Sequence, residues 1–349
     1  MSILFIIIGL SILILGHEFG HFTLARIFKV RVEEFGFGFP PRLFFKKKND
    51  TIYSFNLIPL GGFVKLTGEN DVAGGSDDIN SFANKKAWQR SLIVLGGVIM
   101  NIFLGWLFIF LVLQIGIANH LVITNIIPSS PAAAANLKNG DIIKQVSIDN
   151  KVMMVDPIIT DDFINLVNNN LNKTIQLTIQ RGGKIIDVSL KPLQNPQPNQ
   201  GHLGIGLLNS GLKAQPFFKA FINSFITVFE IIKLTFNGLV NLFENIFVKP
   251  SNVLNSVAGP VGIFVIMSDA FNFGFSYFLQ LLALISLNLA LLNVVPIPAL
   301  DGGRLLFIIF EKILGKPLSE KTQMITTSVS FILLLLLIVF ITINDLHRF

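Results

Sequence analysis

Four apolar segments constrain this chain more than any other feature, because each is long enough to cross the hydrocarbon of a membrane. They lie near residues 2–25, 92–118, 275–297 and 324–343, and the third continues less regularly toward 313. Of all 349 residues, 52% are hydrophobic and only 14% are charged, against roughly 25% charged in soluble domains. The sequence therefore predicts an α-helical polytopic membrane protein with about four transmembrane helices.

Basic residues gather beside the apolar segments and indicate which loops face the cytoplasm. The loop from Arg26 to Arg90 is expected inside, together with the short loop from Lys312 to Lys321. Region 119–274 and the C-terminus are then expected outside. No basic residue precedes the first segment and no small-residue cleavage site ends it, so a retained span is favoured over a signal peptide. The net charge of +6 marks this topology and indicates no nucleic-acid partner.

The region 119–205 is polar and contains alternating stretches joined by the hairpin signal RGG. We predict a small β-rich domain here. Its segment 126–150 resembles the part of a PDZ domain in which a small-residue helical turn leads through Leu-x-x-Gly-Asp into a strand. The chain is thus expected to divide into 1–118, 119–205, 206–274 and 275–349.

Residues 216–247 form a long helical pattern in which polar residues recur every three to four positions among apolar ones. Such a stripe is typical of a helix that lies in the membrane interface. The alternative is a fifth span, which would place the C-terminus inside. Glu230 and Lys233 near mid-membrane favour the interfacial helix, because intramembrane charge is costly.

The inner loop contains two aromatic and β-branched stretches, EFGFGFPPRLFF and TIYSFNLIPLGGFVKL, on either side of the charged tip KKKND at 46–50. This pattern predicts a β-hairpin. Its strands are unusually apolar for a cytoplasmic loop. The hairpin at 35–65 is therefore expected to re-enter the membrane, buried against protein.

The motif GHEFGH at 16–21 places ionisable side chains inside the first apolar segment, where they are costly and usually mark a function. On a helix, His17 and His21 share one face and can point imidazole nitrogens at one metal ion. Glu18 can reach a water molecule there without binding the metal itself. This is the His-Glu-x-x-His pattern of zinc peptidases, with Glu18 as the general base. The chain has no cysteine, so any transition metal must use His, Asp or Glu.

Catalytic zinc generally needs three protein ligands, and Asp301 in LNLALLNVVPIPALDGGRLLF is the strong candidate for the third. His17 lies roughly 22 Å from the outer end of its span by the helical rise. Asp301 lies near the inner end of a span that runs the other way, so both fall in the cytoplasmic half. Pro296 and Pro298 interrupt the helix there, which is tolerated only in a protein-lined or wet cavity. The alternative for Asp301 is a helix-ending Asp-Gly-Gly turn at the interface.

Four other polar residues receive weaker assignments. Asn293 either donates to a substrate carbonyl or holds unwound backbone, and the sequence favours neither role. His120, His202 and His347 lie in polar segments and are expected to be solvated.

With these motifs together, the chain resembles the site-2 protease family of intramembrane zinc metalloproteases, specifically its bacterial RseP/RasP/MmpA type. The resemblance rests on HEFGH, GFGFPPRLF, IPLGGFVKLTGEN, GPVGI and NVVPIPALDGGR, with one PDZ-like region. It implies that His17, His21 and Asp301 bind Zn²⁺ and that Glu18 is the base. It also implies that the hairpin engages substrate. The substrate-binding residues of its second strand would be Gly61, Gly62, Phe63, Val64 and Lys65.

Two features depart from the family pattern. The chain has one PDZ-like region where some relatives carry two. The second span begins VLGGVIMN at 94–101, where the family typically has Gly-Pro before its Asn, so the family's local helix geometry is not carried over.

The resemblance implies hydrolysis of a peptide bond within or near the transmembrane segment of single-span membrane proteins, such as anti-sigma factors or signal-peptide remnants, after a first cut outside the membrane. The expected location is the bacterial cytoplasmic (inner) membrane, and the expected partners are these substrates and the lipid bilayer. Nothing in the sequence indicates an oligomeric state. Two alternatives are a catalytically silent membrane adaptor and an intramembrane proton-coupled transporter. Glu18 disfavours the adaptor, because a structural metal site needs no base.

Overall fold

Four helices in the described part of the chain are long and apolar enough to cross a membrane, which is the number that the sequence predicts. They are α1 (Ser2–Ile27), α2 (Ala87–Ile115), α8 (Phe275–Val294) and α10 (Glu320–Arg348). The chain is therefore a polytopic membrane protein. The computed structural model from which these elements are taken describes residues 2–69, 78–197, 200–245, 257–316 and 318–348.

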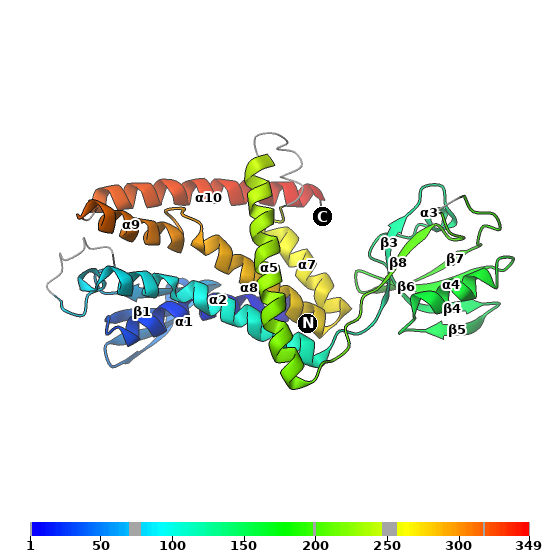
Figure 1. Cartoon of the computed structure of the whole chain (residues 1–349), viewed down its shortest axis with the longest axis horizontal. Coiled ribbons are helices and arrows are strands. Elements are labelled where there is room, and N and C mark those ends of the chain that lie inside the picture. The colour runs from blue at the N-terminus through cyan, green and yellow to red at the C-terminus, as the bar shows by residue number, and fades with distance from the viewer. Residues whose placement is uncertain (1, 70–77, 198–199, 246–256, 317, 349) are drawn as a thin grey trace. The chain divides into compact units, whose positions relative to one another are not determined.

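The chain forms two compact units. The first comprises Met1–Phe110, Phe221–Ser268 and Leu279–Phe349, and the second comprises Leu111–Ala220 and Asp269–Phe278. Figure 1 shows that helices make up most of the first unit and that strands gather in the second.

In the first unit, α1 and α2 approach so closely that glycines form their contact. A Cβ atom added to Gly96 would lie 2.6 Å from the carbonyl oxygen of Gly20, and one added to Gly20 would overlap the Gly96 carbonyl. One added to Gly16 would overlap the side chain of Leu104. Small residues let membrane helices approach at backbone distance. The glycines of GHEFGH therefore set the spacing between α1 and α2.

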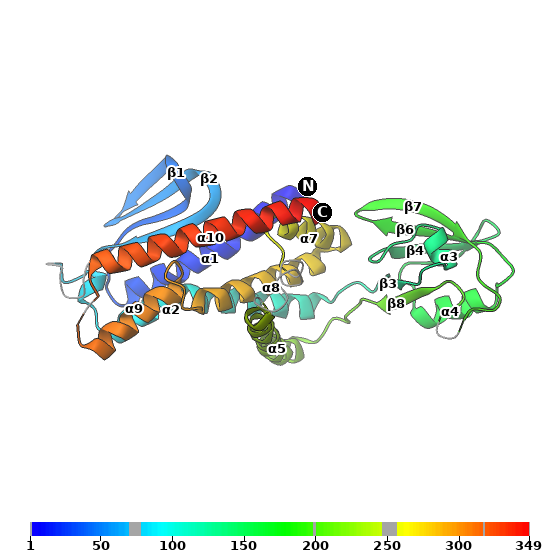
Figure 2. The same cartoon turned by 90° about the horizontal axis from the view of Figure 1, so that it is seen from above.

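The inner loop forms the predicted hairpin, in which β1 (Val32–Lys48) pairs antiparallel with β2 (Thr51–Leu66). The turn falls at Asn49 and Asp50, where Asn49 takes a positive φ of 53°. Both strands contact α1, beside which Figure 2 shows the hairpin. Near the tip the ring of Phe44 is 73% exposed. Such exposure is compatible with a hairpin in the membrane, and re-entry stays a prediction.

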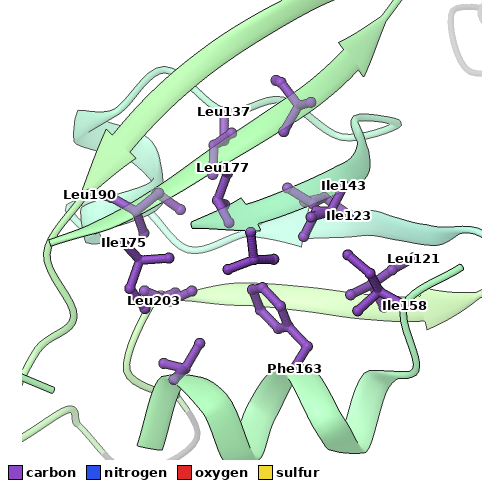
Figure 3. Close-up of a cluster of buried hydrophobic side chains, with 14 of the residues drawn as sticks. Leu121, Ile123, Leu137, Ile143, Ile158, Phe163, Ile175, Leu177, Leu190 and Leu203 are labelled. Carbon is purple, nitrogen blue, oxygen red and sulfur yellow. The ribbon is translucent and has the colours of Figure 1, made fainter. Parts of the chain in front are cut away.

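The second unit holds a β-rich fold, as the region 119–205 predicts. Its elements are β3 (Leu121–Ile126), α3 (Pro131–Ala134), β4 (Ile142–Ile148), β5 (Lys151–Val155), α4 (Thr160–Asn168), β6 (Ile175–Arg181), β7 (Lys184–Leu190) and β8 (Ile205–Asn209). All pairs are antiparallel in the order β7-β6-β4-β3-β8, and β5 pairs with β4 outside this path. Figure 3 shows Phe163 of α4 pointing into the apolar core on the sheet.

A buried ion pair joins two of the segments that predict this fold, LKNGD and RGG. Asp141, from LKNGD, is fully buried, and Arg181, from RGG, donates to its Oδ1 and Oδ2 over 2.7 and 2.6 Å. These hydrogen bonds raise the pKa of the Arg181 guanidinium above its ordinary value. A buried carboxylate needs such a partner. The pair therefore ties the start of β4 to the turn between β6 and β7.

His120 is buried, so the expectation that it is solvated is wrong. The residue is 8% exposed, and its Nδ1 lies 2.7 Å from Oδ2 of Asp156, which also accepts from Lys144 over 3.0 Å. The polar residues beside His120 in the sequence do not reveal this burial, because its partner Asp156 lies in a different segment of the chain. His202 is half-buried and His347 is exposed.

Within the first unit, α5 (Phe217–Asn245) runs across the direction of α2 and α8, as both views show (Figures 1 and 2). The Phe225 ring stacks on that of Trp106 in α2 at 5.1 Å, and Thr235 donates to Asn288 of α8 over 2.9 Å. Among the described helices, α5 is not one of the four candidate spans. A helix transverse to the spans favours the interfacial orientation. Positions 246 and 247 of the predicted helix lie outside the described residues.

The GPVGI motif begins α7 (Pro260–Phe273) and receives a cap from α10. Asp345 is fully buried, and its Oδ2 accepts from the Gly262 backbone amide over 2.7 Å. A Cβ atom on Gly259 would lie 2.8 Å from the same oxygen. A carboxylate at a helix N-terminus satisfies free amides and opposes the helix dipole. The motif thus joins α7 to α10.

We predict that Gly96→Ala destabilises the protein by about 1–3 kcal/mol, because the new methyl group has no room at the α1–α2 contact. The matched control is Gly238→Ala on α5, where an added Cβ meets nothing within 4 Å. Since alanine is the better helix former by about 1 kcal/mol, the control is expected to be neutral or stabilising. Thermal unfolding in detergent checks both. Equal stability of Gly96→Ala and wild type would contradict the prediction.

Candidate metal centre

Helix α1 places the two histidines of HEFGH on one face. The Nε2 atoms of His17 and His21 lie 3.2 Å apart, and the two rings meet edge to face. The Nδ1 atom of His21 lies 2.9 Å from the backbone carbonyl oxygen of Ile93 on α2. A carbonyl oxygen only accepts, so His21 carries its proton on Nδ1 and keeps Nε2 free for a metal.

A break between α8 and α9 (Asp301–Leu314) brings the third candidate ligand to these rings. The segment 295–300 is non-helical, and Asp301 is the first residue of the new helix. It therefore starts a helix and does not lie in the alternative helix-ending turn. A Cβ atom on Gly302 or Gly303 would overlap carbonyl oxygens of the break. The two glycines thus let the start of α9 fold back onto the end of α8.

The three candidate donor atoms are spaced as zinc ligands are. Asp301 Oδ2 lies 3.2 Å from Nε2 of His17 and 3.4 Å from Nε2 of His21, and the two Nε2 atoms are 3.2 Å apart. For bonds of about 2.0–2.1 Å to a tetrahedral centre, neighbouring ligand atoms lie about 3.3 Å apart. Oδ2 of Asp301 is also buried, and no described residue donates a hydrogen bond to it. The donor set and its spacing fit a zinc ion.

These side chains line a cavity of about 390 Å³. Glu18 lies in the same lining, and no described residue forms a hydrogen bond or ion pair with its carboxylate. The cavity is large enough for several water molecules and polar enough to hold them. Glu18 is therefore free to exchange a proton with water beside the three donor atoms. The other lining residues are Phe63, Val64, Leu66, Glu69, Phe82, Ile93, Val94, Asn293, Pro298, Ala299, Leu300, Arg304 and Thr327.

The predicted substrate-binding residues divide into those at the cavity and those away from it. Phe63, Val64 and Asn293 line it. A Cβ atom on Gly62 would lie 3.2 Å from Cγ of Glu18, so this glycine keeps β2 close to the predicted base.

Gly61 and Lys65 are not brought to the cavity lining. Gly61 lies against an aromatic ring of β1. The Lys65 ammonium lies 2.7 Å from Glu33, and its side chain is 64% exposed. Simple alternation along the strand does not explain the split, since the neighbours Phe63 and Val64 both line the cavity; the register of β1 and β2 shifts repeatedly along this stretch.

Several polar residues at the cavity or in contact with its histidines were not predicted. Arg304, three positions after Asp301, forms an ion pair with Glu69, which follows the hairpin. Asn101 of α2 is 1% exposed and contacts the His17 ring. Their signals were present in sequence, as the Arg of DGGR, the Glu of TGEN and the Asn of VLGGVIMN. Their contacts join distant segments, so local pattern could not reveal them.

A second cavity of about 500 Å³ adjoins the first and shares Glu69, Phe82, Arg304 and Thr327 with it. In its lining, Arg90 at the start of α2 donates to both carboxylate oxygens of Glu311 on α9, over 3.0 and 2.6 Å. These paired charges hold α9 in place beside the metal centre.

Comparison with known proteins gives the same assignment as the site. Residues 5–337 match Peptidase family M50. A Synechocystis protein provisionally named a zinc metalloprotease is 34% identical over 348 residues, which cover 96% of this chain and 92% of that protein. A Clostridium perfringens protein with the same provisional description is 31% identical over 99% of this chain and 98% of its own length. The zinc metalloprotease RasP of Oceanobacillus iheyensis is 28% identical, with 98% of each chain covered.

The family match covers nearly the whole chain, including the histidine pair, the hairpin and the Asp301 helix. It favours a protease over the adaptor and transporter alternatives. The chain belongs to peptidase family M50, the site-2 protease family, and is a zinc metalloprotease of the RseP/RasP/MmpA type.

Proposed function

We propose that this chain hydrolyses a peptide bond within or near the transmembrane segment of single-span membrane proteins. The observation that carries the proposal is the single cavity in which a free carboxylate, Glu18, lies beside three donor atoms spaced for zinc. The ligands would be His17, His21 and Asp301. These three residues and Glu18 belong to helices of the first unit, which contains the candidate spans, so the scissile bond of the substrate must enter that unit to be cut.

The chain's own residues divide the chemistry among them. Bound zinc would supply a Lewis acid that makes water acidic near neutral pH and polarises a carbonyl oxygen. Glu18 accepts the proton that water loses as it attacks the scissile carbonyl carbon. Glu18 then gives that proton to the departing amide nitrogen. Asn293 lines the same cavity, which favours donation to a substrate carbonyl over a purely backbone role.

The hairpin would receive the substrate as an added strand. A transmembrane helix satisfies its own amides, so it must unwind before a bond in it can be cut. Among the described strands β2 pairs with β1 alone, and Phe63, Val64 and Leu66 of β2 line the cavity. A substrate strand along the remaining edge regains backbone hydrogen bonds beside Glu18.

The β-rich region 119–205 is proposed to be a PDZ-like domain outside the membrane that excludes substrates with bulky outer domains. A first cut would then be needed before this enzyme acts. The enzyme is proposed to lie in the bacterial cytoplasmic membrane with its centre in the cytoplasmic half, as the basic loops indicate. Anti-sigma factors and signal-peptide remnants are candidate substrates.

Glu18→Gln is expected to lower cleavage of a co-expressed single-span protein by at least about 100-fold, because the base is lost while the ligands remain. Zinc content of the purified variant should equal that of wild type. The same chemical change at Glu230→Gln, on an exposed position of α5, is the control and should leave cleavage intact. Residual activity near wild type in Glu18→Gln would show that the base is another group.

Phe63→Ala is expected to lower kcat/KM by about 10- to 100-fold, because an apolar contact to substrate in the cavity is lost. Lys65→Ala, two positions along the same strand, should change it less than threefold, since Lys65 lies away from the cavity and pairs with Glu33. Peptide cleavage assays in detergent with both variants measure the difference. Equal losses in the two variants would argue against strand addition along this part of β2.

Removal of 119–205 is expected to permit cleavage of a full-length substrate that the wild-type enzyme cuts only after shortening. The reason is that the proposed size filter is gone while the metal centre stays. The control is the shortened substrate, which both enzymes should cleave. If the deletion enzyme cuts the shortened substrate but still spares the full-length one, the region is not a size filter.

A further inference from the structure

Asn101 is a buried polar residue in the middle of an apolar span, and among the described residues its side chain has one hydrogen-bond partner, the ring of a predicted zinc ligand. The residue is 1% exposed, and its Nδ2 lies 3.2 Å from Nδ1 of His17. We propose that Asn101 is a positioning residue whose carboxamide oxygen accepts from Nδ1–H of His17 in the tautomer that binds zinc. This inference rests on the proposed role of His17 as a ligand.

The geometry decides which nitrogen of His17 faces the metal. Nε2 of His17 lies 3.2 Å from Asp301 Oδ2 and 3.2 Å from Nε2 of His21, so Nε2 is on the side of the donor cluster. A metal takes the unprotonated nitrogen of a neutral imidazole. The ring proton must then sit on Nδ1. In a buried site that N–H group needs an acceptor, because an unsatisfied donor is costly.

The Nδ1–H group of the other ring, His21, already has such an acceptor. Its Nδ1 faces the Ile93 carbonyl oxygen at 2.9 Å, which is an acceptor whatever the state of the site. The corresponding neighbour of His17 Nδ1 is the Asn101 carboxamide. Partners of this kind orient metal-binding histidines and raise their basicity.

The Asn101 carboxamide has an acceptor available for this role. Its Oδ1 is buried and has no hydrogen-bond partner among the described residues, while Nδ2 faces the ring. With Nδ2 as the donor, Nδ1 of His17 is the acceptor and carries no proton. A half-turn of the carboxamide exchanges Nδ2 and Oδ1 and lets Oδ1 accept from a protonated Nδ1.

The surroundings hold Asn101 in position for that exchange. Its backbone carbonyl oxygen accepts from the Ser286 hydroxyl over 2.8 Å, which fixes this turn of α2 against α8. Gly97, one turn earlier on α2, lies against the His17 ring, and an added Cβ would overlap ring atoms. The ring thus lies between a glycine that leaves it room and an asparagine that reaches its Nδ1.

The test compares the zinc affinity of full-length variants in detergent by competition with a chelator. Asn101→Leu keeps the approximate shape and removes the acceptor, so affinity should fall by about 10- to 100-fold. Asn101→Asp supplies a carboxylate acceptor and should restore affinity to within about threefold of wild type. The control is Asn288→Leu, which removes an asparagine of α8 whose hydrogen-bond partner is Thr235. This variant should leave zinc affinity unchanged. Thermal unfolding of the metal-free proteins checks that each variant is folded.

Wild-type affinity in a folded Asn101→Leu protein would overturn the inference, and so would an Asn101→Asp protein as weak as Asn101→Leu. His17→Ala separates this failure from failure of the ligand assignment. If His17→Ala binds zinc as wild type does, the proposed ligand set is wrong. If His17→Ala loses zinc while Asn101→Leu keeps it, the ligand set stands and the role of Asn101 alone is refuted.

Discussion

Ionisable side chains inside an apolar helical unit need partners, and His17, His21 and Asp301 find theirs in one another. Their donor atoms lie within 4.8 Å, from two helices that are distant in sequence. The two Nε2 atoms lie 3.2 Å apart, and each lies within 3.4 Å of the same carboxylate oxygen of Asp301. A cation bound there would satisfy all three atoms at once. The free energy that their burial costs would then favour metal binding.

Backbone proximity makes this convergence possible. Gly20 and Gly96 let α1 and α2 touch through their main chains, and Gly302 and Gly303 let α9 fold back on the end of α8. In the membrane, helix association depends on close packing and hydrogen bonds, because lipid is as apolar as the helices. Small residues at both junctions therefore let the helices that carry the three proposed ligands pack closely together. The frequent glycines of the quoted motifs have this physical basis.

Sequence spacing predicts those parts of the centre that lie within one helix, and helical depth predicts the meeting of His17 with Asp301. The hairpin and the β-rich region also follow from local pattern. Local pattern fails where a polar residue is satisfied by a distant one. The polar residues beside His120 in the sequence predict a solvated ring, yet the ring is buried in an ion pair with Asp156. Arg304 and Glu69 form a pair that nothing in either motif indicates.

The two histidines of the centre are held by different kinds of acceptor, and this difference has a consequence. The partner of His21 Nδ1 is a backbone carbonyl, which can only accept, so the fold fixes that tautomer before any metal binds. The partner of His17 Nδ1 is a carboxamide, which can donate or accept, so that ring can carry its proton on either nitrogen. If both rings bind zinc through Nε2, the fold alone sets the tautomer of His21, whereas that of His17 also depends on which way the Asn101 carboxamide is turned.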